Sequence, residues 1–210
     1  MLNEKREGIA FFGFTNVMTR ELNATRTAYV GEPYLWSGAI SVNIPVTKQI
    51  ANINADNRHY MELSGENTLA GSITFVSILP AEYGKIMSLT RVEGKGTRFT
   101  GKLPVKHFSM SFEQESTNDD RNKIIAYDLY VTNAPPIDAT TSPPEGATPK
   151  DFVLEVAGFE LHYPTANGKD KSVSYDWINS AADPARWAEN TETIVFPYEL
   201  LPDEEPDAEG

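Results

Sequence analysis

Apolar and polar residues alternate with a period of two along much of the chain, which is typical of half-buried β-strands. The clearest runs cover residues 40–46, 108–112 and 125–131, and less regular ones cover 9–17, 28–30, 69–79 and 172–178. Pro45 cannot donate a hydrogen bond to a sheet, so the first run predicts an edge strand or a strand end. The polar residues 113–123 predict a long hairpin with an acidic tip.

Residues 152–163 change parity within one apolar run. Phe152, Leu154 and Val156 share one parity, whereas Phe159, Leu161 and Tyr163 share the other. A single inserted residue would keep both sets on one face, so the pattern predicts a β-bulge at Gly158.

Two short stretches favour helix. After Pro80, which suits a first helical position, Tyr83, Ile86 and Met87 recur at helical spacing until residues 88–90. A second short helix is predicted over residues 183–189, with Trp187 facing the core. Many short strands separated by turns predict a mainly β fold: an antiparallel β-sandwich or barrel with one flanking α-helix and long loops.

The chain of 210 residues favours one domain over residues 1–198. Residues 134–149 hold five of the 14 prolines and predict an exposed insertion loop, with a domain boundary as the alternative. Residues 199–210 carry six carboxylates and no cation, which predicts a disordered acidic tail.

Charge and composition exclude several classes of function. There are 18 Lys and Arg against 30 Asp and Glu, a formal charge of −12, which disfavours tight binding of nucleic acid or anionic lipid. The absence of cysteine excludes disulfides and thiol chemistry. The first residues have no apolar signal core, and no apolar run reaches the ~20 residues of a membrane helix, so we expect a soluble protein made in the cytoplasm.

Enzyme motifs are weak. Residues 96–102 match G-x-x-x-x-G-K, but Leu103 stands where a Ser or Thr would bind magnesium, so we interpret the segment as a glycine-rich hairpin turn. The three histidines, His59, His107 and His162, have no metal-ligand spacing. We therefore assign no catalytic, cofactor-binding or metal-binding residue and expect no enzyme, although a glycosidase pair of carboxylates from distant strands stays open.

The tryptophans allow two interpretations. Trp36, Trp177 and Trp187 could form a platform for stacking sugars, but tryptophans so widely scattered are more often core or interface residues.

Several stretches taken together resemble the major tail protein, or tail tube protein, of long non-contractile-tailed bacteriophages, in the group common in phages of Gram-positive hosts. The segments that carry this resemblance are residues 8–14, 35–46, 53–62, 72–87, 108–115 and 123–136. The proline-rich segment 134–149 departs from the family pattern, and residues 164–198 match it only vaguely.

The resemblance implies a β-sandwich or barrel with one flanking helix. It implies hexameric rings of this chain, stacked into a hollow tube through which the genome passes, in contact with tape-measure, tail-terminator and distal tail proteins. It implies no catalytic residue, no cofactor and no membrane partner. The expected location is the virion, after assembly in the host cytoplasm.

Two regions are our candidates for assembly contacts. The strand at 39–46 and the hairpin at 106–131 are candidates for an inter-subunit barrel, and the polar loop at 47–58 is a candidate for contact between rings. The barrel candidates are Ile40, Val42, Ile44, Val46, Phe108, Met110, Phe112, Ile125, Tyr127, Leu129 and Val131; the ring-to-ring candidates are Lys48, Gln49, Asn52, Asn54, Asp56 and Arg58.

Two other functions remain open from the sequence. One is a monomeric β-sandwich module that binds carbohydrate or serves as an adhesin. The other is a β-rich hydrolase that uses two distant carboxylates.

Overall fold

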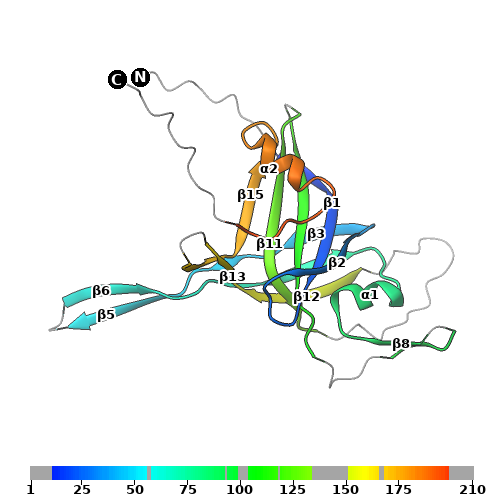
Figure 1. The fold of residues 1–210 in the computed structure, drawn as a ribbon, viewed down its shortest axis with the longest axis horizontal. Helices are drawn as coiled ribbons and strands as arrows, with labels where there is room; N and C mark the ends of the chain where they lie inside the picture. The colour runs from blue at the N-terminus through cyan, green and yellow to red at the C-terminus, as the bar shows by residue number, and fades with distance from the viewer. Residues whose placement is uncertain are drawn as a thin grey trace.

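The computed structural model describes residues 11–55, 58–92, 94–98, 104–117, 119–133, 151–165 and 168–198. It confirms the predicted fold class: a mainly β, antiparallel fold with two short helices. Within the described residues, nine strands form one sheet (Figure 1). They are β1 (Phe11–Leu22), β2 (Tyr29–Leu35), β3 (Ala39–Asn43), β4 (Val46–Thr47), β7 (Thr68–Phe75), β10 (Phe108–Ser116), β11 (Arg121–Val131), β12 (Phe152–Phe159) and β15 (Tyr175–Asn179).

The sheet is bent into two layers that meet at β11. Its order is β2-β1-β10-β11-β12-β7-β3, with β15 also paired to β11 and β4 also paired to β7. The first half of β11 pairs with β15, and its last residues pair with β12. The two partners diverge from this point, so β1, β10, β11 and β15 cross the layer of β12, β7 and β3 steeply (Figure 1).

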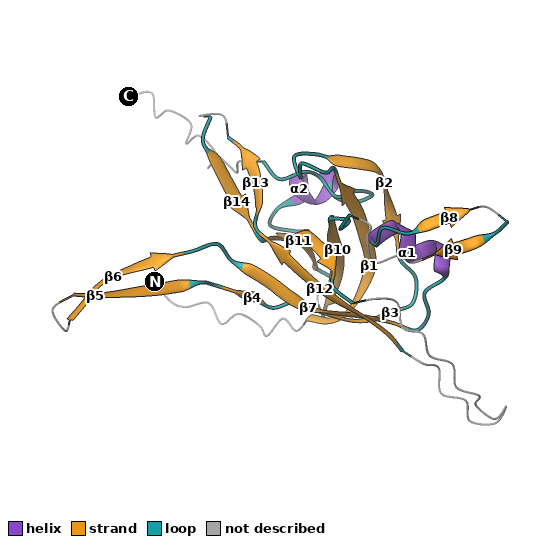
Figure 2. Ribbon diagram, turned by 90° about the horizontal axis from the view of Figure 1, so that it is seen from below, coloured by secondary structure: helices purple, strands orange, loops and turns teal. Residues whose placement is uncertain are grey.

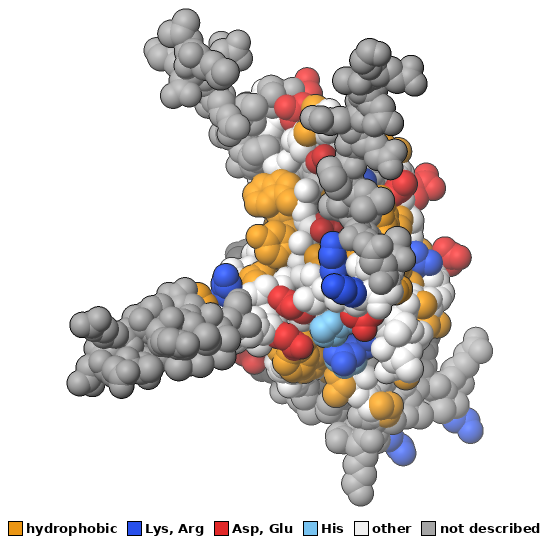
Figure 3. All heavy atoms as spheres, turned by 60° about the vertical axis from the view of Figure 1, so that its left-hand side comes forward, with side chains coloured by type: hydrophobic (Ala, Val, Ile, Leu, Met, Phe, Trp, Pro, Cys, Tyr) orange, Lys and Arg blue, Asp and Glu red, His pale blue; other side chains and the backbone are white. Residues whose placement is uncertain are grey.

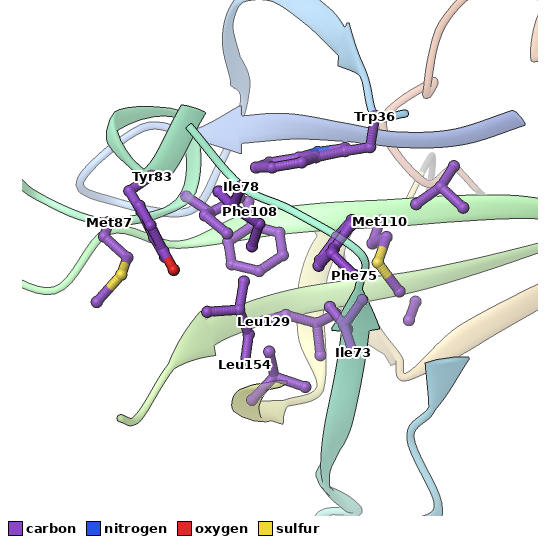
Figure 4. Close-up of a cluster of buried hydrophobic side chains, with 14 of the residues drawn as sticks. Trp36, Ile73, Phe75, Ile78, Tyr83, Met87, Phe108, Met110, Leu129 and Leu154 are labelled. Atoms are coloured by element: carbon purple, nitrogen blue, oxygen red, sulfur yellow. The ribbon is translucent and has the colours of Figure 1, made fainter. Parts of the chain in front are cut away.

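The main hydrophobic core lies between these layers. Phe108 and Met110 of β10 pack there with Ile73 and Phe75 of β7 and with Leu154 of β12 (Figure 4). Helix α1 (Pro80–Ile86) closes one end by burying Tyr83, Ile86 and Met87, as its helical spacing predicts.

A second cluster covers the outer face of the central strands. Ile125 and Tyr127 of β11 pack there with Leu161, Ile178 and Ile194. Trp187 of α2 (Pro184–Glu189) packs against the same cluster, as predicted. The C-terminal part of the described chain therefore supplies a third layer over the sheet.

In the described part of the chain, three hairpins stand apart from the main sheet (Figure 2). Strands β5 (Ile50–Ala55) and β6 (Arg58–Ser64) form a long two-stranded ribbon, which we call the arm. Strands β8 (Thr90–Val92) and β9 (Gly96–Arg98) form a short one. From the sequence we interpret the glycine-rich string 96–102 as a hairpin turn, but its first three residues form strand β9 and the turn residues 94–95 precede it; residues 99–102 lie outside the described residues. Strands β13 (Leu161–Pro164) and β14 (Asp170–Val173) form the third.

Most predicted strands are present with shifted ends. The run at 40–46 is divided between β3 and β4 around Pro45, and β3 lies at one end of the sheet, so the edge prediction is confirmed. The polar residues 113–123 belong mainly to β10 and β11, which do pair as a hairpin. The predicted insertion loop 134–149 and acidic tail 199–210 lie outside the described residues.

The predicted bulge at Gly158 is wrong. Strand β12 pairs with β7 without a register shift from Phe152 to Phe159, and the parity changes because a new strand, β13, begins at Leu161. Phe159 points to the other face, where it is 41% exposed.

The bulge lies instead in β11. Phe108 pairs with Leu129 but Met110 pairs with Ala126, so β11 has one extra residue, and Asp128 has a φ of 49°. This bulge was hidden in the sequence because β11 separates two cores and is apolar on both faces. Gly158 faces it closely: a Cβ there would lie 2.7 Å from the Asp128 carbonyl oxygen.

Candidate functional site: an apolar groove and a projecting arm

Five of the eleven predicted barrel residues are buried inside the subunit. Strands β10 and β11 are each paired along both edges, so neither offers a free edge to a neighbouring chain. Phe112 and Val131 are half-buried against the main core. The fully buried members are Phe108, Met110, Ile125, Tyr127 and Leu129. These five side chains stabilise the subunit's own cores and do not reach its surface.

The predicted strand at 40–46 is better placed for contact. Among the described strands, β3 pairs only with β7 and β15 only with β11, and β2 ends the sheet on the opposite side. Ile40 is 44% exposed, and Val42, Ile44 and Val46 are half-buried. Free edges of this kind are templates for pairing with another chain.

An apolar groove opens where the sheet divides. Its volume is about 350 Å³, and it is lined by Val42, Ile44 and Val46 on one side and by Tyr175 and Trp177 of β15 on the other. Tyr175 is 48% exposed and Trp177 is 56% exposed. Figure 3 brings this side of the molecule forward and shows apolar side chains gathered on it.

The chemistry of the groove favours an apolar occupant. Among the side chains that line it, only the Tyr175 hydroxyl and the Trp177 indole N–H are polar. Sites for small polar ligands need several convergent hydrogen-bonding groups. The groove is therefore suited to aliphatic or aromatic side chains.

The three tryptophans do not form one platform. The Trp36 ring is buried in the main core, where its Nε1 donates to the Thr19 hydroxyl at 2.8 Å. Trp187 packs against the second cluster. Only Trp177 is largely exposed. Its alternation with Tyr175 on β15 is the signal by which the sequence could have indicated this surface.

The predicted ring-to-ring loop is not a loop. Lys48 and Gln49 lie between β4 and β5, whereas Asn52 and Asn54 belong to β5 and Arg58 begins β6; Asp56 lies outside the described residues. The loop prediction failed because polar asparagines alternate with Ala51 and Ile53, a pattern that a two-stranded ribbon tolerates. The role of this segment in contacts between rings stays a prediction.

A buried ion pair fastens the C-terminal layer to the sheet. The Lys123 side chain is fully buried, with Nζ 3.2 Å from Glu113 Oε1 and 5.2 Å from the centre of the Trp187 ring. Its ammonium also donates to the Asn190 carbonyl oxygen. Burial lowers the pKa of Lys123, and the Glu113 carboxylate opposes that shift. This pair could not be recognised from the sequence, since both residues fall in a polar run.

A second buried carboxylate sits at the bulge of β11. Asp128 is fully buried, and its oxygens lie 2.6 Å from His107 Nδ1 and 2.8 Å from Arg26 Nη1. These contacts tie the turn before β2 and the start of β10 to the bulge. His162 lies 3.6 Å from Glu66, and the His59 side chain is outside the described part of the structure.

Within the described residues, no group of three or more His, Asp or Glu is placed to hold a metal ion. No helix in that part of the chain is both long and apolar enough to cross a membrane. A scan against protein-family models and a search of curated proteins found no match for this chain. The likeness to tail tube proteins therefore rests on the segments named above and stays a prediction.

Proposed function

We propose that this chain is a structural virion protein that polymerises as stacked hexameric rings into the tail tube of a phage, the conduit for genome ejection. The observation that carries the proposal is the combination of free strand edges with a projecting arm. Head-to-tail contacts between different surfaces close into rings when the rotation closes and otherwise continue as filaments. A tube needs both kinds of contact.

The two surfaces suit the two directions of growth. The edges of β2, β3 and β15 that pair with no other described strand are available for lateral contact within a ring. The arm extends away from the main sheet and is suited to contact along the tube axis (Figures 1 and 2). Other tail proteins, namely the tape measure, the tail terminator and the distal tail protein, would contact the ends and the bore.

The net charge fits a conduit. A formal charge of −12 repels DNA phosphates at short range, and salt screens the repulsion beyond about 8 Å. An acidic bore would let DNA pass without being held, whereas lysines would each bind phosphate.

Electron microscopy of the concentrated protein in negative stain tests the proposal. We expect rings or tubes from the whole chain and soluble, unassembled subunits after deletion of residues 48–58. Removal of residues 203–210 is the matched control, and it should leave assembly intact. Monodisperse particles from the whole chain under all conditions, including seeding with isolated tails, would refute the proposal.

One observation favours a second function. The exposed aromatic pair Tyr175 and Trp177 resembles a surface on which sugars stack, as in a monomeric carbohydrate-binding or adhesin module. The scarcity of polar side chains in the groove speaks against it. Saturable binding to a glycan array, lost on Trp177→Ala in a protein that stays monomeric, would favour this alternative.

A further inference from the structure

We propose that ordered water binds between β10 and the C-terminal layer, where it joins the hydroxyls of Tyr29, Ser109 and Ser111. The inference concerns the interior of the subunit and is independent of the proposed function. It adds a hydration site to a layer that otherwise packs against the sheet through apolar side chains.

Three hydroxyl groups on this side of the sheet are buried without a protein partner. Ser109 and Ser111 are fully buried on β10. Their Oγ atoms and the Tyr29 hydroxyl oxygen are shielded from solvent, and they form no hydrogen bond within the described part of the protein. Buried polar groups in native proteins are nearly always hydrogen-bonded, either to the protein or to ordered water. Three such hydroxyls therefore point to water as their partner.

The three hydroxyls belong to one region of the interior. Ser109 and Ser111 are two residues apart on β10, so their side chains leave the same face of the sheet. Ser111 pairs with Met18 on one side and with Ile125 on the other, and both of these residues belong to the second cluster. Tyr29 packs against the same cluster. All three hydroxyls therefore lie where the C-terminal layer covers the sheet.

The surroundings of Tyr29 supply further partners for water. Burial raises the pKa of the Tyr29 phenol, the Ser109 hydroxyl close to it lowers that pKa, and the Asp176 carboxylate raises it. Ser109 is thus near the phenol without reaching hydrogen-bonding geometry. Asp176 accepts from the Tyr127 hydroxyl at 2.9 Å and lies 2.6 Å from Arg186 Nη2, and the Nε of that arginine is buried without a partner. Internal water usually makes about three hydrogen bonds, and these groups provide both donors and acceptors.

Tyr83 provides a contrast within the same protein. Its hydroxyl is also buried without a partner, but Tyr83 belongs to the main core, where the neighbouring side chains are apolar. A water molecule needs at least two polar partners to stay in a buried site. Tyr83→Phe is therefore the matched control for Tyr29→Phe.

The direction of the stability change tests the inference. If water joins the hydroxyls, Tyr29→Phe and Ser111→Ala each leave other buried groups without a partner. Each should then raise the equilibrium constant for unfolding, measured in urea, at least about fivefold. Tyr83→Phe removes a hydroxyl that has no partner, so it should leave this constant unchanged or lower it. The same outcome for Tyr29→Phe and Ser111→Ala would show that their hydroxyls are dry and would overturn the inference.

Magnetic relaxation dispersion of water gives an independent readout, because it counts long-lived internal waters in the folded, unassembled chain. The double variant Tyr29→Phe and Ser111→Ala should hold at least one such water fewer than the parent, whereas Tyr83→Phe should hold the same number. An unchanged count in the double variant would overturn the inference, whatever its stability.

Discussion

Replacing Gly71 by alanine should destabilise the subunit through its backbone. A Cβ at this position of β7 would lie 1.9 Å from the Asn43 carbonyl oxygen and 2.8 Å from the Ile44 Cα. Real Cβ contacts stay beyond 3.0 Å, so the segment that joins β3 to β4 must retreat by more than 1 Å. That segment contains Pro45, whose carbonyl accepts from the Ala70 N–H at 3.4 Å.

The size of the loss in the free energy of unfolding depends on which contacts break when this segment moves away from β7. Overpacking usually costs about 1–3 kcal/mol. If β3 and β4 detach completely, Val42, Ile44 and Val46 lose their half-burial, which is about 1 kcal/mol each. The free energy of unfolding should therefore fall by about 1–3 kcal/mol if the segment only shifts, and by about 3 kcal/mol if both strands detach.

Urea unfolding followed by tryptophan fluorescence measures this loss. Gly84→Ala in α1 is the matched control, because a Cβ there meets nothing within 4 Å. Alanine in a helix interior should raise the free energy of unfolding by about 0.5–1 kcal/mol. A Gly71→Ala protein within about 0.5 kcal/mol of the parent would show that β7 and the β3–β4 junction are not this close.

Three further predictions concern buried polar groups. Lys123→Met should cost about 3 kcal/mol in urea unfolding, because the buried Glu113 carboxylate loses its nearer cation and keeps only Arg121 Nη1 at 3.7 Å; the double variant with Glu113→Leu should recover part of that loss. Asp128→Asn should cost about 1–3 kcal/mol while keeping the left-handed backbone, which asparagine tolerates; Asp128→Ala should cost more, and equal losses would argue against strain at this residue. Burial raises the pKa of Tyr127 and of Tyr29 above 10, so the folded state favours the neutral phenols. Their contribution to the free energy of unfolding is fully present below pH 10, and above pH 10 each phenol loses about 1.4 kcal/mol per pH unit. Tyr127→Phe should therefore make the loss of stability at alkaline pH less steep. Ionisation of both phenols in the folded protein would contradict this prediction.

The sequence predicted the class of fold because local chemistry specifies it. Pro80 and the spacing of Tyr83, Ile86 and Met87 define α1, and alternation defines β10 and most of β11. Pro45 indicated the edge at β3. These signals depend on residues close together in the chain, so they can be recognised without knowledge of the tertiary structure.

The register of β11 could not be predicted in the same way. Period two shows which residues share a face only if the strand is regular, and the extra residue at Asp128 moves Ile125 and Leu129 into different cores. The partners of Lys123 were hidden for a related reason, because Asn190 is 67 residues away in sequence. A contact between residues so far apart in the chain produces no periodic pattern in the sequence.

The β3–β4 segment lines the groove and leads directly into the arm. Effects on subunit stability and on assembly can therefore be tested separately. Gly71 allows the β3–β4 junction to approach β7, which places Ile44 and Val46 at the groove and directs the next residues into the arm. Gly71→Ala should therefore impair assembly even at temperatures where the subunit stays folded. Lys123→Met acts on the opposite side of the sheet, so it should lower stability without raising the critical concentration for assembly. If both variants impaired assembly in proportion to their loss of stability, the β3–β4 segment would have no specific part in assembly.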